Sequence, residues 1–118
     1  MDENATKVLK MLCQPNKVLR FLWIYQYLIG LYGINHEEVE SQTTFTEYIK
    51  STMPLIPTVA TRDQKKLNKN PNCKEDMFTY IRNTIGHPNV FDVSSFDMEI
   101  PSIDVYLPQL EEMAINTM

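Results

Sequence analysis

Glycine is scarce in this chain, with three among 118 residues, and no stretch of any length alternates apolar with polar side chains. Such alternation is typical of a half-buried strand, whereas apolar residues that recur at steps of three and four are typical of a helix. The apolar residues of this chain follow the helical steps. The sequence therefore predicts an all-α protein.

Cysteines, net positive charge and long apolar runs are also missing or few. Cys13 and Cys73 stand in no metal-ligand spacing, which predicts free thiols in a reducing compartment, the cytoplasm. The net charge of −4 excludes a globally basic nucleic-acid binder, so any RNA contact needs a local patch. The most apolar stretch, residues 18–34, contains Arg20, Gln26 and two glycines and is too short to cross a bilayer. The chain starts with acidic residues, so we expect no signal peptide.

The 118 residues are enough for one domain with its own core, which is either the whole protein or part of a larger one. We expect a four- to five-helix bundle with helices over residues 4–12, 17–32 (with Asn16 as its cap), 36–53, from 74 or 75 to 85, and 103–115.

Three of these helices carry a further expectation. The helix over 17–32 is apolar round most of its circumference, which favours the bundle centre or contact with a second copy. The threonines after Ser41 allow a break in the third helix. Residues 88–101 are predicted to be extended, and Pro108 indicates that the last helix starts near Leu107 or is kinked.

The segment over residues 54–73 is predicted to be a loop, with a short helix within it as an open alternative, and it begins the most positive part of the chain. One acid, Asp63, stands among five basic residues: Arg62, Lys65, Lys66, Lys69 and Lys74. Two interpretations stay open. The segment is either a solvated charged loop or an arm that binds the phosphates of RNA.

A short motif at the end of the fourth predicted helix brings Arg82, Asn83 and His87 together. The guanidinium of arginine is a charged fork that fits a phosphate, and histidine transfers protons near neutral pH. Gly86 ends the helix and Pro88 disfavours helical geometry at His87, which leaves the histidine free to turn back toward Arg82. The structural alternative is that Arg82 pairs with a nearby acid while His87 caps the last helical carbonyls.

The segment Arg82-Asn83-Thr84-Ile85-Gly86-His87 resembles the signature of the HEPN superfamily, in which an arginine, a polar residue and three more residues precede a histidine. The resemblance implies a helical bundle that dimerises and brings two motifs into one cleft. Many members are metal-independent endoribonucleases of toxin–antitoxin, phage-defence and CRISPR-associated systems. Others are inactive and serve as nucleotide-binding or scaffold domains.

On this resemblance, His87 would transfer the proton, Arg82 would hold the scissile phosphate and Asn83 would orient one of them. No metal and no cofactor is implied, and the implied partners are a second copy, RNA and a cognate antitoxin or other protein. Toxins of one branch carry a modified tyrosine two residues after the histidine, where this chain has Asn89. A ribonuclease, a non-catalytic HEPN module that binds a nucleotide, RNA or a protein, and an unrelated helical adaptor remain open.

Overall fold

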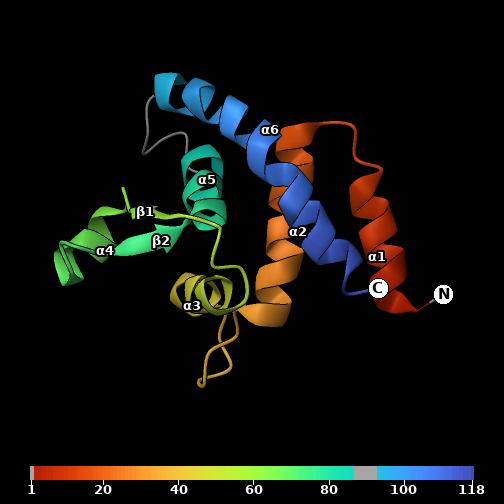
Figure 1. Cartoon of the computed structure of the whole chain (residues 1–118), viewed down its shortest axis with the longest axis horizontal. Helices are drawn as coiled ribbons and strands as arrows, with labels where there is room; N and C mark the ends of the chain where they lie inside the picture. Colours follow the sequence, from red (N-terminus) through yellow and green to blue (C-terminus); the bar gives the residue numbers. More distant parts are fainter. Residues whose placement is uncertain (1, 87–92) are drawn as a thin grey trace.

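The computed structural model of the chain describes residues 2–86 and 93–118, with the backbone alone for 93–100. Within these residues, six helices accompany one two-stranded antiparallel sheet (Figure 1). The elements are α1 (Glu3–Leu12), α2 (Lys17–Tyr32), α3 (Gln42–Thr52), β1 (Thr58–Ala60), α4 (Gln64–Lys69), β2 (Lys74–Asp76), α5 (Met77–Gly86) and α6 (Val93–Ile115). The mostly helical character is confirmed, and the small sheet is an element that the sequence did not predict.

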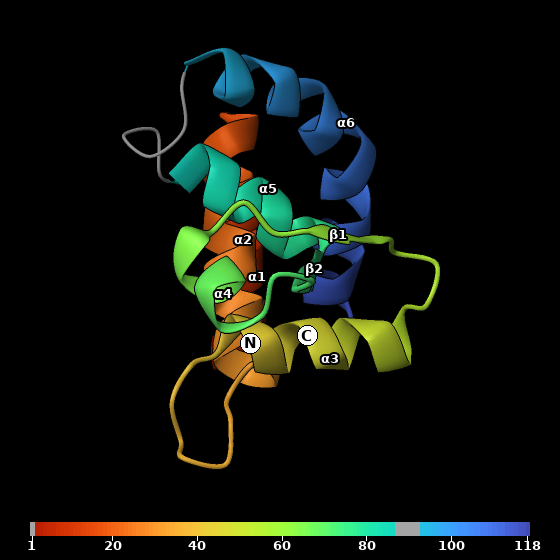
Figure 2. The ribbon, with the colours of Figure 1, turned by 90° about the vertical axis from the view of Figure 1, so that its left-hand side faces the viewer.

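Helix α2 is the centre of the bundle and packs against α1, α3, α5 and α6 (Figures 1 and 2). Its buried side chains are Phe21, Ile24, Tyr25, Leu28 and Ile29. Other apolar side chains of the same helix remain on the surface, with exposed fractions of 42% for Leu19, 45% for Trp23 and 43% for Leu31. Burial of an apolar face is the main favourable contribution to folding, so α2 organises the core while one apolar edge stays uncovered.

Side-chain caps explain where the first three helices begin. Asp2 accepts a hydrogen bond from the backbone N–H of Ala5 over 2.7 Å, and Asn16, the predicted cap, accepts one from Leu19 over 3.0 Å. The hydroxyl of Ser41 accepts one from the N–H of Thr44 over 3.2 Å. Each bond satisfies an amide that has no partner within the helix.

The prediction of a helix from residue 36 is wrong over residues 36–41. This segment is a tight loop that projects from the bundle (Figure 2), in which the Asn35 carboxamide accepts the N–H groups of Glu37 and Val39. An isolated bridge pairs Ile34 with Glu40. Asparagine side chains that bond the nearby backbone compete with helix formation, which is why the helix starts only after Ser41.

Strands β1 and β2 form a hairpin within the region predicted as a loop and at the start of the predicted fourth helix. Thr58 lies opposite Asp76 and Ala60 opposite Lys74, with α4 in the connection between the strands. Helix α5 therefore starts at Met77, two or three residues later than predicted. Asp76, the last strand residue, accepts the N–H of Thr79 over 3.0 Å in the manner of a helix cap.

Helix α6 begins at Val93, so the prediction of an extended segment is wrong from residue 93 to 101, while residues 88–92 lie outside the described part. The helix runs through both Pro101 and Pro108 and curves along its length (Figure 2). Each proline removes a backbone hydrogen bond, and a bend is the usual result. No helix in the described part of the chain has the length and hydrophobicity that a bilayer crossing requires.

Candidate functional site

Arg82 and Asn83 lie near the C-terminal end of α5. The guanidinium Nη1 of Arg82 donates to the side-chain oxygen of Asn83 over 3.3 Å. The same guanidinium lies over Gly86, where an added Cβ atom would be 3.5 Å from Nη1. His87, the third predicted residue, lies outside the described residues. The arginine of the motif is therefore oriented by its neighbour and placed beside the residue that precedes the histidine.

Asn83 is 7% exposed and uses its whole carboxamide within the protein. Its oxygen accepts from Nε2 of Gln42 over 2.8 Å as well as from Arg82. Its Nδ2 donates to Oε1 of Gln42 over 3.0 Å and to Oε2 of Glu75 over 3.4 Å. A buried amide with every group bonded has one orientation, so the acceptor that faces Arg82 is fixed.

Lys66 completes this set, which we call the Asn83 cluster: Gln42, Lys66, Glu75, Arg82 and Asn83. The ammonium of Lys66 lies 2.9 Å from the Glu75 carboxylate and donates to Oε1 of Gln42 over 2.6 Å. The Glu75 side chain is 4% exposed and that of Lys66 is 22% exposed. A carboxylate so deeply buried needs a paired charge, and Lys66 supplies it.

A second buried network lies under the motif, on the other face of β2. Asp76 is fully buried and accepts from the hydroxyls of Thr46 over 2.7 Å and of Thr79 over 2.6 Å. The Tyr25 hydroxyl lies 2.8 Å from that of Thr79. Burial, reinforced by the charge of Asp76, raises the pKa of Tyr25 far above its usual value, so the phenol stays neutral. The network ties α2, α3 and α5 together at the base of the motif.

Strand geometry explains why two adjacent acids serve two different networks. Neighbouring side chains of a strand point to opposite faces, so Glu75 reaches the Asn83 cluster while Asp76 reaches Thr46 and Thr79. The sequence indicated Glu75 and Asp76 as acids of a helical first turn and as possible partners of Arg82, not as members of two separate networks. It gave no signal for Gln42, which lies 41 residues before Asn83.

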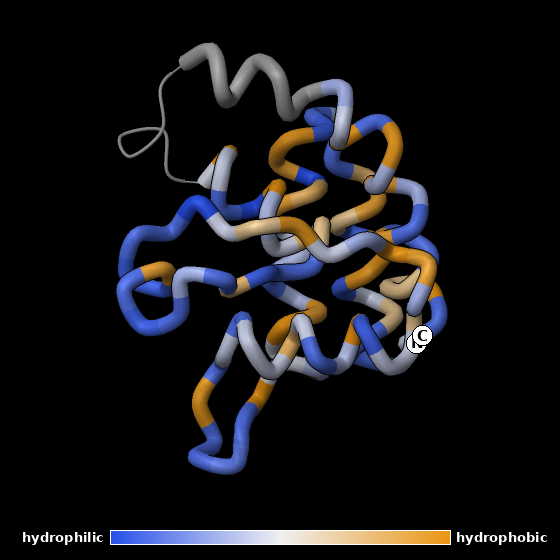
Figure 3. Tube along the Cα trace, turned by 60° about the vertical axis from the view of Figure 1, so that its left-hand side comes forward, coloured by the Kyte–Doolittle hydropathy of each residue, from blue (hydrophilic) through white to orange (hydrophobic). Residues whose placement is uncertain are grey.

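The remaining basic residues lie on or beside the connection between the two strands, which we call the α4 arm (residues 61–73). Arg62, Lys65, Lys69 and the adjoining Lys74 are exposed. The carboxylate of Asp63 accepts the backbone N–H of Lys65 over 2.9 Å and so caps α4. Figure 3 shows the mostly hydrophilic arm at one edge of the molecule. The arm is a local positive surface on an acidic protein.

The described residues contain no group of three or more histidine, cysteine, aspartate or glutamate side chains that could hold a metal ion. Cys13 and Cys73 are free thiols. Comparison of the chain with protein-family models, with curated proteins and with solved structures gives no match. The interpretation of the site therefore depends on its own residues.

Proposed function

We propose that this chain is a metal-independent endoribonuclease of the HEPN type that acts as a dimer with its two motifs in one cleft. The five longer helices, α1, α2, α3, α5 and α6, would be the helices of the HEPN-like bundle. The observation that carries the proposal is the Arg82 side chain, whose guanidinium donates to Asn83 over 3.3 Å and lies over Gly86, one residue before His87. A positive charge that is oriented before the substrate binds stabilises the charge that develops on a transferring phosphoryl group.

The chemistry would be a transesterification within the RNA strand. The ribose 2′-hydroxyl attacks the adjacent phosphorus, the bond to the 5′-oxygen breaks, and a 2′,3′-cyclic phosphate forms. His87 would take the proton of the 2′-hydroxyl or give one to the leaving oxygen, and Arg82 would bind the phosphate oxygens. Asn83 would act through Arg82 as a positioning residue.

The surface supplies two further supports. The exposed basic residues of the α4 arm, Lys65 and Lys69 among them, would attract the RNA backbone, while Lys66 is committed to Glu75. Leu19 and Trp23, four residues apart on α2, leave an apolar strip for a second copy. A cytoplasmic toxin or phage-defence nuclease, held in check by an antitoxin protein, is the setting that we propose.

The test is RNA cleavage in the presence of EDTA, with the product ends analysed for cyclic phosphate. We expect the parent to cleave, and Arg82→Ala and His87→Ala each to lower the rate by about 100-fold or more. His36→Ala is the matched control, because His36 is exposed beside Glu37 in the loop before α3. A folded, dimeric parent that leaves RNA intact, or a His87→Ala variant as fast as the parent, would refute the catalytic proposal.

The second candidate is a non-catalytic module that binds RNA through the α4 arm. It is favoured by the inward-facing Asn83, whose carboxamide is satisfied within the protein, and by the exposed positive arm. In this case Lys65→Ala with Lys69→Ala should weaken RNA binding and reduce the salt slope of log K by about two. His87→Ala would then leave binding unchanged, and no variant would cleave.

A further inference from the structure

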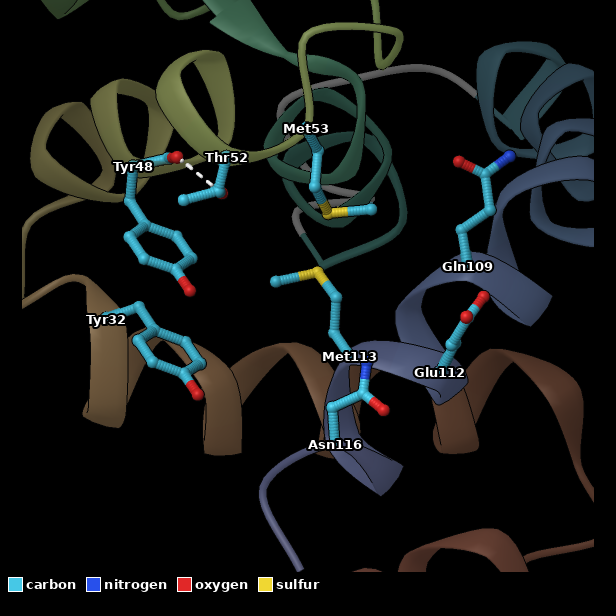
Figure 4. Close-up of a pocket in the computed structure, with 8 residues that line it drawn as sticks. All are labelled: Tyr32, Tyr48, Thr52, Met53, Gln109, Glu112, Met113 and Asn116. Carbon is cyan, nitrogen blue, oxygen red and sulfur yellow. Dashed lines mark hydrogen bonds between the residues drawn. The ribbon is translucent and has the colours of Figure 1, made fainter.

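A cavity of about 260 Å³ lies where the last turns of α2, α3 and α6 meet, and it shares no residue with the Asn83 cluster. Tyr32 and Tyr48 form one wall, Met53 and Met113 face each other in the middle, and Gln109 and Glu112 lie on the other side (Figure 4). These side chains come from three separate helices, so only the folded chain forms the cavity.

The tyrosine wall is neutral and polarisable. The two rings stack in parallel, with centroids 4.4 Å apart and planes 2° apart. Burial, and to a lesser degree the neighbouring Tyr48, raises the pKa of Tyr32, so its hydroxyl carries no charge at physiological pH. Aromatic rings attract cations, and the thioethers of methionine adapt to apolar groups of varied shape.

The electrostatic character of the cavity is negative. The C-terminal end of a helix carries a partial negative charge, and neither α2 nor α6 has a basic residue in its last turn. Lys50 in the last turn of α3 lies 3.6 Å from Glu47 and is not part of the cavity wall. Glu112 adds a full negative charge, and no lysine, arginine or histidine is among the described residues that line the cavity.

We propose that this cavity binds a small organic ammonium ion, with its charged group at Glu112 and its apolar part between the tyrosines and the methionines. A cavity of about 150 Å³ can hold benzene, so this one, at about 260 Å³, has room for a ring with a short substituent. The negative surroundings disfavour carboxylates and phosphates of the same size. The proposal is independent of the ribonuclease function.

The experiment is an NMR titration with benzylammonium, read from the methyl signals of the methionines. The signals of Met53 and Met113 should move, and those of Met11 and Met77, which lie outside the cavity wall, should stay. Benzyl alcohol, which has the same ring with a neutral group, should bind about fivefold more weakly and cause smaller shifts at the same concentration, and benzoate should cause the smallest. Absence of a shift with benzylammonium at 10 mM, or an equal response to benzyl alcohol, would overturn the proposal.

Two variants test the assignment of the charge. Glu112→Gln should weaken benzylammonium binding about fivefold, which corresponds to about 1 kcal/mol for a partly exposed ion pair. Glu38→Gln removes the same charge from the loop before α3, outside the cavity wall, and should leave the affinity unchanged. Thr52→Arg places a cation at the cavity and should weaken benzylammonium binding by a similar factor. If Glu112→Gln binds as tightly as the parent, Glu112 is not the anionic partner and the proposal fails.

Discussion

Replacing Lys66 by methionine should destabilise the folded protein by about 3 kcal/mol, because the change leaves a buried carboxylate without its paired charge. In the parent, the Lys66 ammonium is 2.9 Å from Glu75, whose side chain is 4% exposed. In the variant, the remaining partner of Glu75 in the Asn83 cluster is Nδ2 of Asn83 at 3.4 Å. One long hydrogen bond from a neutral amide replaces little of the lost interaction.

Urea unfolding followed by circular dichroism measures the effect. With a slope of about 2 kcal/mol per molar urea, the midpoint should fall by about 1.5 M. Lys65→Met, the exposed neighbour on α4, is the matched control and should change stability by less than about 0.5 kcal/mol. The double variant Lys66→Met with Glu75→Gln should recover much of the loss, since no buried charge then remains.

The reasoning is refuted if Lys66→Met is as stable as Lys65→Met. In that case Lys66 is not needed to neutralise Glu75 and is available to bind RNA phosphates, as the sequence had suggested. A binding assay on the same two variants separates the roles. The structural role predicts that Lys66→Met, where it remains folded, binds RNA no more weakly than Lys65→Met.

Three further substitutions test the stability of the fold. Tyr25→Phe should cost about 1 kcal/mol at pH 7 through the lost hydrogen bond to Thr79. Burial raises the pKa of Tyr25, so the contribution of its neutral phenol to the free energy of unfolding is complete below the unfolded pKa of about 10 and is lost progressively above it. Between pH 10 and 11 the free energy of unfolding should therefore fall by up to about 1.4 kcal/mol more in the parent than in Tyr25→Phe. Urea titrations that show equal decreases for the two proteins would contradict the burial of the phenol. Gly33→Ala should destabilise by about 2 kcal/mol, since the new Cβ would lie 2.4 Å from Cγ1 of Ile29 and 3.1 Å from Cβ of Phe45. In Gly30→Ala the nearest atom to the new Cβ would be Oε2 of Glu40 at 3.6 Å, so this change should instead stabilise α2 by about 0.8 kcal/mol. Thermal unfolding in which Gly33→Ala and Gly30→Ala shift the melting temperature in the same direction would refute the packing argument.

The elements that the sequence predicted well are those with local causes. Helix α2 spans the predicted residues because its apolar repeat and its cap, Asn16, lie within or next to the helix. The predicted start of α3 was wrong because the side chains of Asn35 and Ser41 accept hydrogen bonds from the nearby backbone. These bonds favour a loop before Ser41 and a helix after it. Short-range hydrogen bonds set the start of both helices, but only α2 also has a strong apolar repeat that can be recognised in the sequence.

The elements that were missed have distant causes. Residues 74–76 form a strand because residues 58–60 pair with them, and neither segment alternates for long enough to be recognised alone. Helix α6 continues through Pro101 because Ile103, Leu107 and Leu110 are buried in the core. Tertiary burial offsets the unfavourable local preference of proline.

The sequence by itself determined the mostly helical character, the place of the central helix and the short motif that contains Arg82 and Asn83. Only the tertiary structure decided that Gln42 and Lys66 hold the surroundings of Asn83, and that three helix ends line a negative cavity open to solvent. Helical periodicity depends on neighbours within one or two turns, and a single chain carries that information directly. The partners of a buried polar group are set by which elements pack together, and that depends on contacts between residues far apart in the chain.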